Sequence, residues 1–206
     1  HLMRKIFLVA FTLTAFCSFG QDSLRVRLEL LTNRVVQMFY AGDNTPDTIF
    51  NSNILEAKGL ANSLNDKKTL SNLLRMEGLR GLAITGNVQL GYSKVDSAFS
   101  LSFEAKDSVG ISRGHSAKAN LFLYQGEAEK ALTHFVEALA FINTQDDLEL
   151  LQSYYSLAYC YDKMNEEAEA AYFFNKLLGL NITDPGYLPK SAYFKIMADA
   201  YHYLDR

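Results

Sequence analysis

Proline and cysteine are both scarce in this sequence of 206 residues. It has three prolines, and none lies among the 138 residues between Pro46 and Pro185. Because proline removes a backbone donor and breaks helices, this long proline-free stretch favours long helices. Two cysteines are too few for a disulfide scaffold, which excludes the small disulfide-rich class of secreted domain.

A large excess of charge of one sign is also missing. The chain has 20 Lys and Arg against 23 Asp and Glu, a formal net charge of −3. No strong positive field is available to hold DNA, RNA or an anionic membrane, so we expect no nucleic-acid partner for this region. Hydrophobic residues make up 49% and charged residues 21%, which predicts a folded domain rather than a disordered chain.

Motifs for catalysis, metals and cofactors are missing as well. The sequence has no Gly-rich phosphate loop after a strand, no nucleophile elbow and no Cys/His pair in a catalytic motif. His115, His134 and His202 have no partner at zinc-type sequence spacing, and His134 is predicted to be a solvated surface residue. Cys160 is expected to serve packing rather than chemistry. We therefore expect that the protein is not an enzyme and that it has no cofactor and no metal site.

The first 20 residues have the pattern of a secretory signal peptide. Arg4 and Lys5 precede an apolar run from Ile6 to Cys17, and small residues follow at Ser18 and Gly20. The run is shorter than the roughly 20 apolar residues that a membrane-spanning helix needs. The pattern predicts a signal peptide over residues 1–20, cleaved after Gly20, and an exported protein that is periplasmic or extracytoplasmic.

Cys17 leaves an alternative open, in which this cysteine is the lipid acceptor of a lipoprotein. Phe16 precedes it, whereas lipoprotein sites carry a small residue at that position. Two interpretations of this segment therefore remain: a signal peptide that is cleaved without lipidation, or a lipoprotein signal with lipidation at Cys17.

Apolar residues in the rest of the chain recur at spacings of three and four, which is the period of an amphipathic helix. Alternating apolar and polar residues, the mark of strands, are rare. The sequence therefore predicts an all-α fold with helices over residues 24–40, 46–64, 69–84, 93–105, 109–124, 127–142, 147–163, 166–178 and 189–204.

Two of these helix pairs carry the same internal repeat. Ala131, Phe135 and Ala138 recur 39 residues later as Ala170, Phe174 and Leu177. A small residue lies 12 positions before each leading alanine, an aromatic follows three positions later, and a turn residue comes next; these are Ala119, Phe122 and Gly126 in one copy and Ala158, Tyr161 and Asn165 in the other. Weaker copies are found at Ala57, Ala61 and Leu64, at Ala98, Ser102 and Ala105, and at Ala198 and Tyr201.

Residues 119–139 and 157–177 resemble the tetratricopeptide repeat family, in which helices A and B of each repeat cross at small residues. The resemblance implies an α-α superhelix, a solenoid of helix-turn-helix repeats. It divides the chain into a divergent helix pair (21–66) and repeats at about 67–106, 107–144, 146–180 and 187–206, the last incomplete. The period of 39–41 residues exceeds the 34 usual in this family, which implies longer helices or loops.

In this family, helix A faces a concave groove that holds peptides. Carried onto this sequence, the resemblance places Ser116 and Leu123 in the groove together with six candidate binding residues: Arg113, Asn120, Gln152, Tyr155, Tyr159 and Asp162. Tyrosines suit extended peptides because they offer a large contact area at low entropy cost. For Tyr155 and Tyr159, a solvated wall or packing against a neighbouring helix remains the alternative.

These observations predict an exported, non-catalytic protein that binds a protein or peptide partner in its groove. An alternative arises from residues 106–113, which resemble linkers in extracytoplasmic repeat regions of Bacteroidetes-type sensor kinases and helix-turn-helix transcriptional regulators. In that alternative the chain is the sensory input region of a membrane signal transducer.

The last predicted helix has little polar face, so we expect the natural protein to continue beyond Arg206. Membrane contact is expected only through the signal peptide or a downstream segment.

Overall fold

The computed structural model describes residues 2–41, 46–143, 146–184, 186 and 188–205, and of residues 2–19 it describes the backbone alone. His1, Tyr187 and Arg206, which bound predicted segments, lie outside the described residues, as does the side chain of Cys17. The described residues form nine helices and no strand; the helices are α1 (Leu2–Ala41), α2 (Asp47–Ser63), α3 (Lys67–Thr85), α4 (Val88–Glu104), α5 (Ser108–Tyr124), α6 (Ala128–Leu139), α7 (Asp147–Lys163), α8 (Glu167–Leu178) and α9 (Lys190–Leu204).

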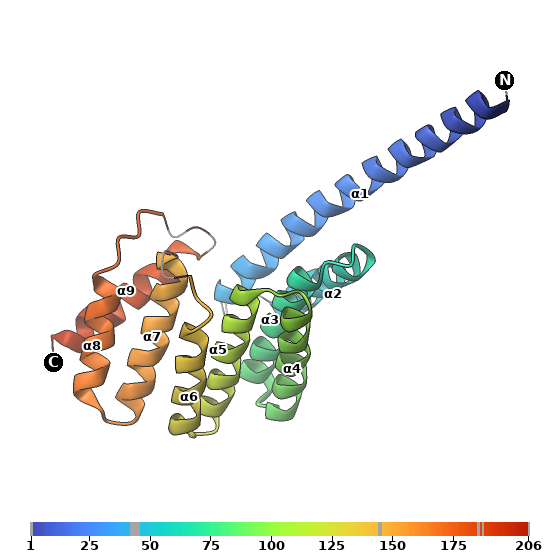
Figure 1. The fold of residues 1–206 in the computed structure, drawn as a ribbon. Coiled ribbons are helices and arrows are strands. Elements are labelled where there is room, and N and C mark those ends of the chain that lie inside the picture. The colour runs from blue at the N-terminus through green and yellow to red at the C-terminus, as the bar shows by residue number, and fades with distance from the viewer. Residues whose placement is uncertain (1, 42–45, 144–145, 185, 187, 206) are drawn as a thin grey trace.

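Each helix packs against the next one along the chain, and the most extensive contacts join α3 with α4, α5 with α6, and α7 with α8. Figure 1 shows the pair α7–α8, the pair α5–α6 and the pair α3–α4 following one another along the array, with the N-terminal half of α1 projecting away from them. Contacts also join odd-numbered helices, since α5 lies against both α3 and α7. This arrangement confirms the predicted all-α helical-repeat solenoid.

Five of the turns between helices share one backbone conformation. A residue with positive φ precedes the N-cap of the next helix, and this left-handed conformation reverses the chain within two residues. Asp66 and Asn87 then cap α3 and α4, since each side-chain oxygen accepts a hydrogen bond from a backbone N–H of the first turn. The positive-φ residues are Asn65 (54°), Gly86 (66°), Lys106 (51°), Gly126 (76°) and Asn165 (59°).

The repeat residues that the sequence singles out form the crossings of the two best-matched pairs. Ala119, Ala131, Ala158 and Ala170 are all fully buried, so the backbones of paired helices approach closely there. The larger residues join neighbouring pairs: Phe135 packs with residues of α7, and the Phe174 ring centroid lies 4.7 Å from that of Tyr203 on α9. In the structure, α5 packs against α6 and α7 packs against α8 within these two predicted repeat units.

In the earlier pairs the weaker copies lie on the buried face of their helices, and each buried stripe begins seven residues before the predicted set. Ala98 and Ser102 of the predicted set are buried in α4 and Ala105 follows the end of the helix, while Gly91 and Val95 are buried as well. Gly91 lies inside α4 and close to α3. A Cβ added to Gly78 of α3 would lie 3.1 Å from the carbonyl oxygen of Gly91. Likewise Ala57 and Ala61 of the predicted set are buried in α2, Leu64 packs against the same cluster, and the buried stripe begins at Phe50. Seven residues make nearly two helical turns. Residues seven positions apart therefore lie on one helix face, and sequence spacing alone does not show where the buried stripe begins.

The two ends of the chain also differ from the predictions. The first helix begins at Leu2 instead of Leu24, so the predicted signal segment and the first packed helix form one continuous rod. At the other end, Ala198 and Tyr201 are exposed and Ala200 is the buried residue of α9. The reason is that α9 follows a long connection, so its register is set by packing on α7 and α8 rather than by a short turn.

Within the described residues, no helix is both long enough and apolar enough to cross a membrane.

Candidate binding surface on the odd-numbered helices

Four of the predicted groove positions lie together on the face formed by the odd-numbered helices. They surround a pocket of about 160 Å³, which we call the polar hollow. The C-terminal end of α1 closes one side of this hollow, a contribution that repeat spacing could not indicate. The lining comprises Phe39 and Tyr40 from α1, Arg75 and Leu79 from α3, Ser112, Arg113, Ser116, Ala117 and Asn120 from α5, and Glu149, Gln152, Ser153 and Ser156 from α7.

An ion pair crosses the polar hollow from one repeat to the next. Nη2 of Arg113 contacts Oε1 of Glu149, and Nε of Arg113 lies 3.4 Å from Oε2 of the same carboxylate. The Glu149 side chain is 7% exposed and that of Arg113 is 27% exposed. Because a buried carboxylate requires a partner, the guanidinium of Arg113 compensates Glu149 and holds α5 against α7.

Gln152 is engaged in the same hollow. Oη of Tyr40 donates a hydrogen bond of 3.0 Å to Oε1 of Gln152, a contact between residues 112 positions apart. This bond attaches the end of α1 to α7, so Gln152 organises the wall of the hollow.

A second, larger hollow adjoins the first at Asn120. It has a volume of about 380 Å³, and we call it the tyrosine hollow. The Tyr159 and Tyr124 side chains are 41% and 55% exposed, and Nζ of Lys163 lies 5.0 Å from the centre of the Tyr159 ring. The lining is Asn120, Leu123, Tyr124, Gly126, Ala128, Tyr159 and Lys163. An apolar wall, two aromatic faces, one amide and one cation therefore converge on one surface.

The remaining two predicted residues lie elsewhere. Oη of Tyr155 donates a 2.7 Å hydrogen bond to Oδ2 of Asp199 on α9, and burial together with this bond raises the pKa of Tyr155. Burial by itself raises the pKa of Asp199, but the hydrogen bonds from Lys195 and Tyr155 outweigh it, so the pKa lies below its ordinary value. Asp162 borders a separate hollow of about 600 Å³ beside Tyr203. The sequence therefore places Tyr155 on the right helix, but the structure uses it to hold α9.

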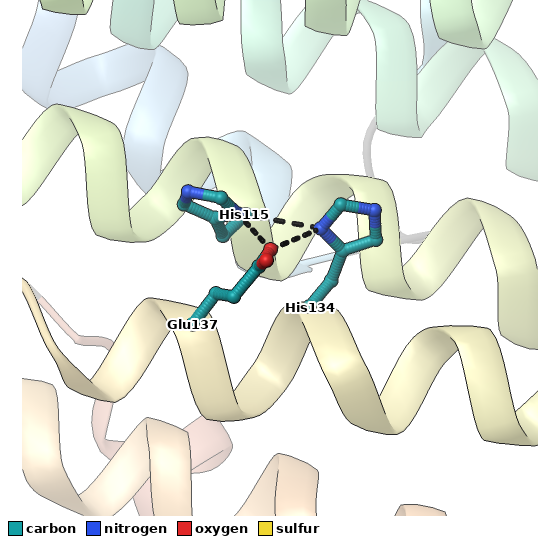
Figure 2. A group of neighbouring side chains, drawn as sticks. All are labelled: His115, His134 and Glu137. Atoms are coloured by element: carbon teal, nitrogen blue, oxygen red, sulfur yellow. Dashed lines mark hydrogen bonds and ion pairs between the residues drawn. The ribbon is translucent and has the colours of Figure 1, made fainter.

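A group of titratable side chains on α5 and α6 was not foreseen, and the prediction of His134 as a solvated surface residue is wrong. Its ring is partly buried and stacks on Phe122, with centroids 5.4 Å apart. Figure 2 shows His134 and His115 pointing toward the carboxylate of Glu137. Burial lowers the pKa of His115, and this effect outweighs the neighbouring Glu137 charge, which raises it. Sequence spacing missed this group because His115 lies on a different helix from the other two.

No protein-family model matches the chain, and no curated protein sequence matches it either. The resemblance to tetratricopeptide repeats therefore rests on this chain's own residues and stays a prediction.

Proposed function

We propose that this chain is a non-catalytic binding protein that holds an extended peptide or protein segment in the tyrosine hollow. The observation that carries the proposal is the exposure of Tyr124 and Tyr159, which line one hollow together with Asn120 where α5, α6 and α7 pack against one another. Aromatic rings left this exposed contribute little to the folded core but offer a large rigid contact area to a ligand.

The chemistry of the hollow fits a peptide backbone flanked by side chains. The amide of Asn120 has both donors and an acceptor, which matches the alternating N–H and C=O groups of an extended chain. Leu123 supplies apolar contact, and the ammonium of Lys163 favours a ligand that carries a carboxylate nearby. In the neighbouring polar hollow, Arg113 and Gln152 already have partners, so they fix the shape of the surface rather than grip the ligand.

The proposal includes two predictions from the sequence. The resemblance assigns the repeats to the tetratricopeptide family, whose members bind peptides on the corresponding face. The pattern of residues 1–20 favours export, so the partner would be a periplasmic or extracytoplasmic protein.

The proposal is tested by selecting peptides from a random display library on the full chain and measuring their affinities. Tyr159→Ala and Asn120→Ala should each weaken the selected peptides by roughly tenfold or more, as expected for a central contact. Tyr172→Ala is the matched control, because Tyr172 is also 54% exposed but lies on α8, outside the hollow. Failure to enrich any peptide, or an equal loss in the Tyr172 variant, would refute the proposal.

A further inference from the structure

Three side chains of one helix pair direct their ligand-type atoms at a common point. His115 comes from α5, while His134 and Glu137 lie three residues apart on α6 and share one face of that helix. Nδ1 of His115 lies 3.0 Å from Oε2 of Glu137, and Nδ1 of His134 lies 2.9 Å from the same oxygen. The two Nδ1 atoms are 3.3 Å apart (Figure 2).

Aromatic packing fixes the orientation of both imidazoles. The His115 ring packs edge-on against Phe99 with centroids 4.7 Å apart and stacks on Phe141 at 5.6 Å. The His134 ring stacks on Phe122 at 5.4 Å with an interplanar angle of 10°. The two nitrogens therefore converge because their rings are held on defined faces, which is the preorganisation that a ligand site needs.

Hydrogen bonding alone satisfies this arrangement poorly. For both rings to donate to Glu137, each must carry its proton on Nδ1, and the two N–H groups then converge on one oxygen with their nitrogens 3.3 Å apart. A divalent cation removes this conflict, because it accepts a lone pair from each neutral imidazole and from the carboxylate at the same time.

The spacing also has the dimensions of a metal site. In tetrahedral zinc coordination with bonds of roughly 2.0–2.1 Å, the donor atoms lie about 3.3 Å from one another. The three donor separations here, 2.9, 3.0 and 3.3 Å, are within a few tenths of an ångström of that value. His₂Glu with an open fourth position is a known ligand set for zinc, and imidazole donors favour zinc and the neighbouring transition metals over Mg²⁺ or Ca²⁺.

We propose that His115, His134 and Glu137 form a three-ligand site for Zn²⁺ or a similar first-row divalent cation. The Glu137 side chain is 47% exposed, so the fourth position opens to solvent and can be filled by water or by a ligand atom of a partner. Because its ligands come from both helices of one hairpin, the bound cation clamps α5 to α6. The site is separate from the tyrosine hollow, so it stands or falls independently of the peptide-binding proposal.

The test uses the full chain, stripped with a chelator and titrated with Zn²⁺ in competition with a chromophoric chelator. We expect one tightly bound Zn²⁺ per chain, a higher Tm in its presence, and at least tenfold weaker binding in His134→Ala and Glu137→Gln. These two positions are chosen because His115 packs between two phenyl rings, where substitution endangers folding. The double variant His1→Ala/His202→Ala controls for adventitious histidine binding and should bind Zn²⁺ like the wild type.

A second readout separates coordination from general stability. With Co²⁺ in place of Zn²⁺, the wild type should show the intense visible absorption of a four-coordinate site, and Glu137→Gln should lose it while its far-ultraviolet circular dichroism stays unchanged. Zn²⁺ affinity that is unaltered in both ligand variants, or that is lost equally in the His1/His202 control, overturns the proposal.

Discussion

The hydroxyl of Tyr155 lies 2.7 Å from Oδ2 of Asp199 and donates a hydrogen bond to it, which joins α7 to α9. The same oxygen also accepts from Nζ of Lys195 at 2.6 Å. A residue expected to contact a ligand therefore positions the last helix of the array. This polar contact adds to the apolar packing of α9, in which Ala200 is buried and Ile196, Met197 and Leu204 are partly buried.

Removing the hydroxyl should loosen that attachment. Tyr155→Phe keeps the ring contact with Phe174 but deletes a hydrogen bond to a charged acceptor, so we expect a loss of about 1–2 kcal/mol in the free energy of unfolding. Urea denaturation of both proteins measures it. Tyr201→Phe is the control, because Tyr201 lies exposed on α9, and it should be neutral. Equal stability of the wild type and Tyr155→Phe would show that the bond does not hold α9.

Asp199 should make this attachment sensitive to acid. Its pKa lies below the ordinary value of 3.8 in the folded protein, because the hydrogen bonds from Lys195 and Tyr155 outweigh burial. A carboxyl group with a lowered folded pKa stabilises the protein above its unfolded pKa, and this contribution disappears as pH falls through the folded pKa. The wild type should therefore lose more Tm than Asp199→Asn between about pH 5 and pH 2. Parallel Tm curves for the two proteins would contradict the assignment.

The helix crossings at buried alanines should not accept larger residues. Ala131→Leu or Ala170→Leu adds three carbons where the alanine is fully buried, so we expect each variant to lose about 1–3 kcal/mol of stability. Thermal denaturation followed by circular dichroism measures the loss. Ala198→Leu, at an exposed position of α9, should change stability little. Similar Tm values for all three variants would show that these crossings are not close-packed.

Cys160 should be chemically inert in the folded protein. The thiol is buried, its Sγ lies 3.3 Å from the carbonyl oxygen of Ala128, and burial raises its pKa to about 11. Because the thiolate is the reactive form, little of it exists near neutral pH. In a Cys17→Ser background, a thiol reagent at about pH 8 should label the native protein far more slowly than the protein in denaturant. Fast native labelling would contradict the packing role.

The Arg113–Glu149 pair should be costly to break from one side. Arg113→Ala removes the guanidinium that pairs with the Glu149 carboxylate, which is 7% exposed, and we expect a loss of about 3 kcal/mol in the free energy of unfolding. The double variant Arg113→Met/Glu149→Leu should recover most of that stability, because both charges of this pair are then removed together. Urea denaturation of both variants compares them. A double variant as unstable as Arg113→Ala would mean that the cost comes from packing rather than charge.

Much of the fold could be predicted from local patterns. Helix ends follow from short-range chemistry, such as the cap at Asp66 and the left-handed turn at Asn165, and eight of the nine helices in the described residues begin within five residues of the predicted start. The repeat register succeeded where alanines mark the crossing, at Ala131 and Ala170. At α4 the predicted Ala98 and Ser102 are buried, but spacing did not indicate that Gly91 and Val95 extend the same buried stripe.

Function depends on contacts between segments far apart in sequence. The sequence by itself determined the helical period, the turn positions and the small residues at two crossings, because these depend on neighbours within a few residues. Only the tertiary structure decided that Tyr40 meets Gln152, that Tyr155 holds α9 instead of a ligand, and that His115 joins His134 and Glu137. The physical reason is that a side chain's partner is chosen by how whole helices pack, and no local spacing records that choice.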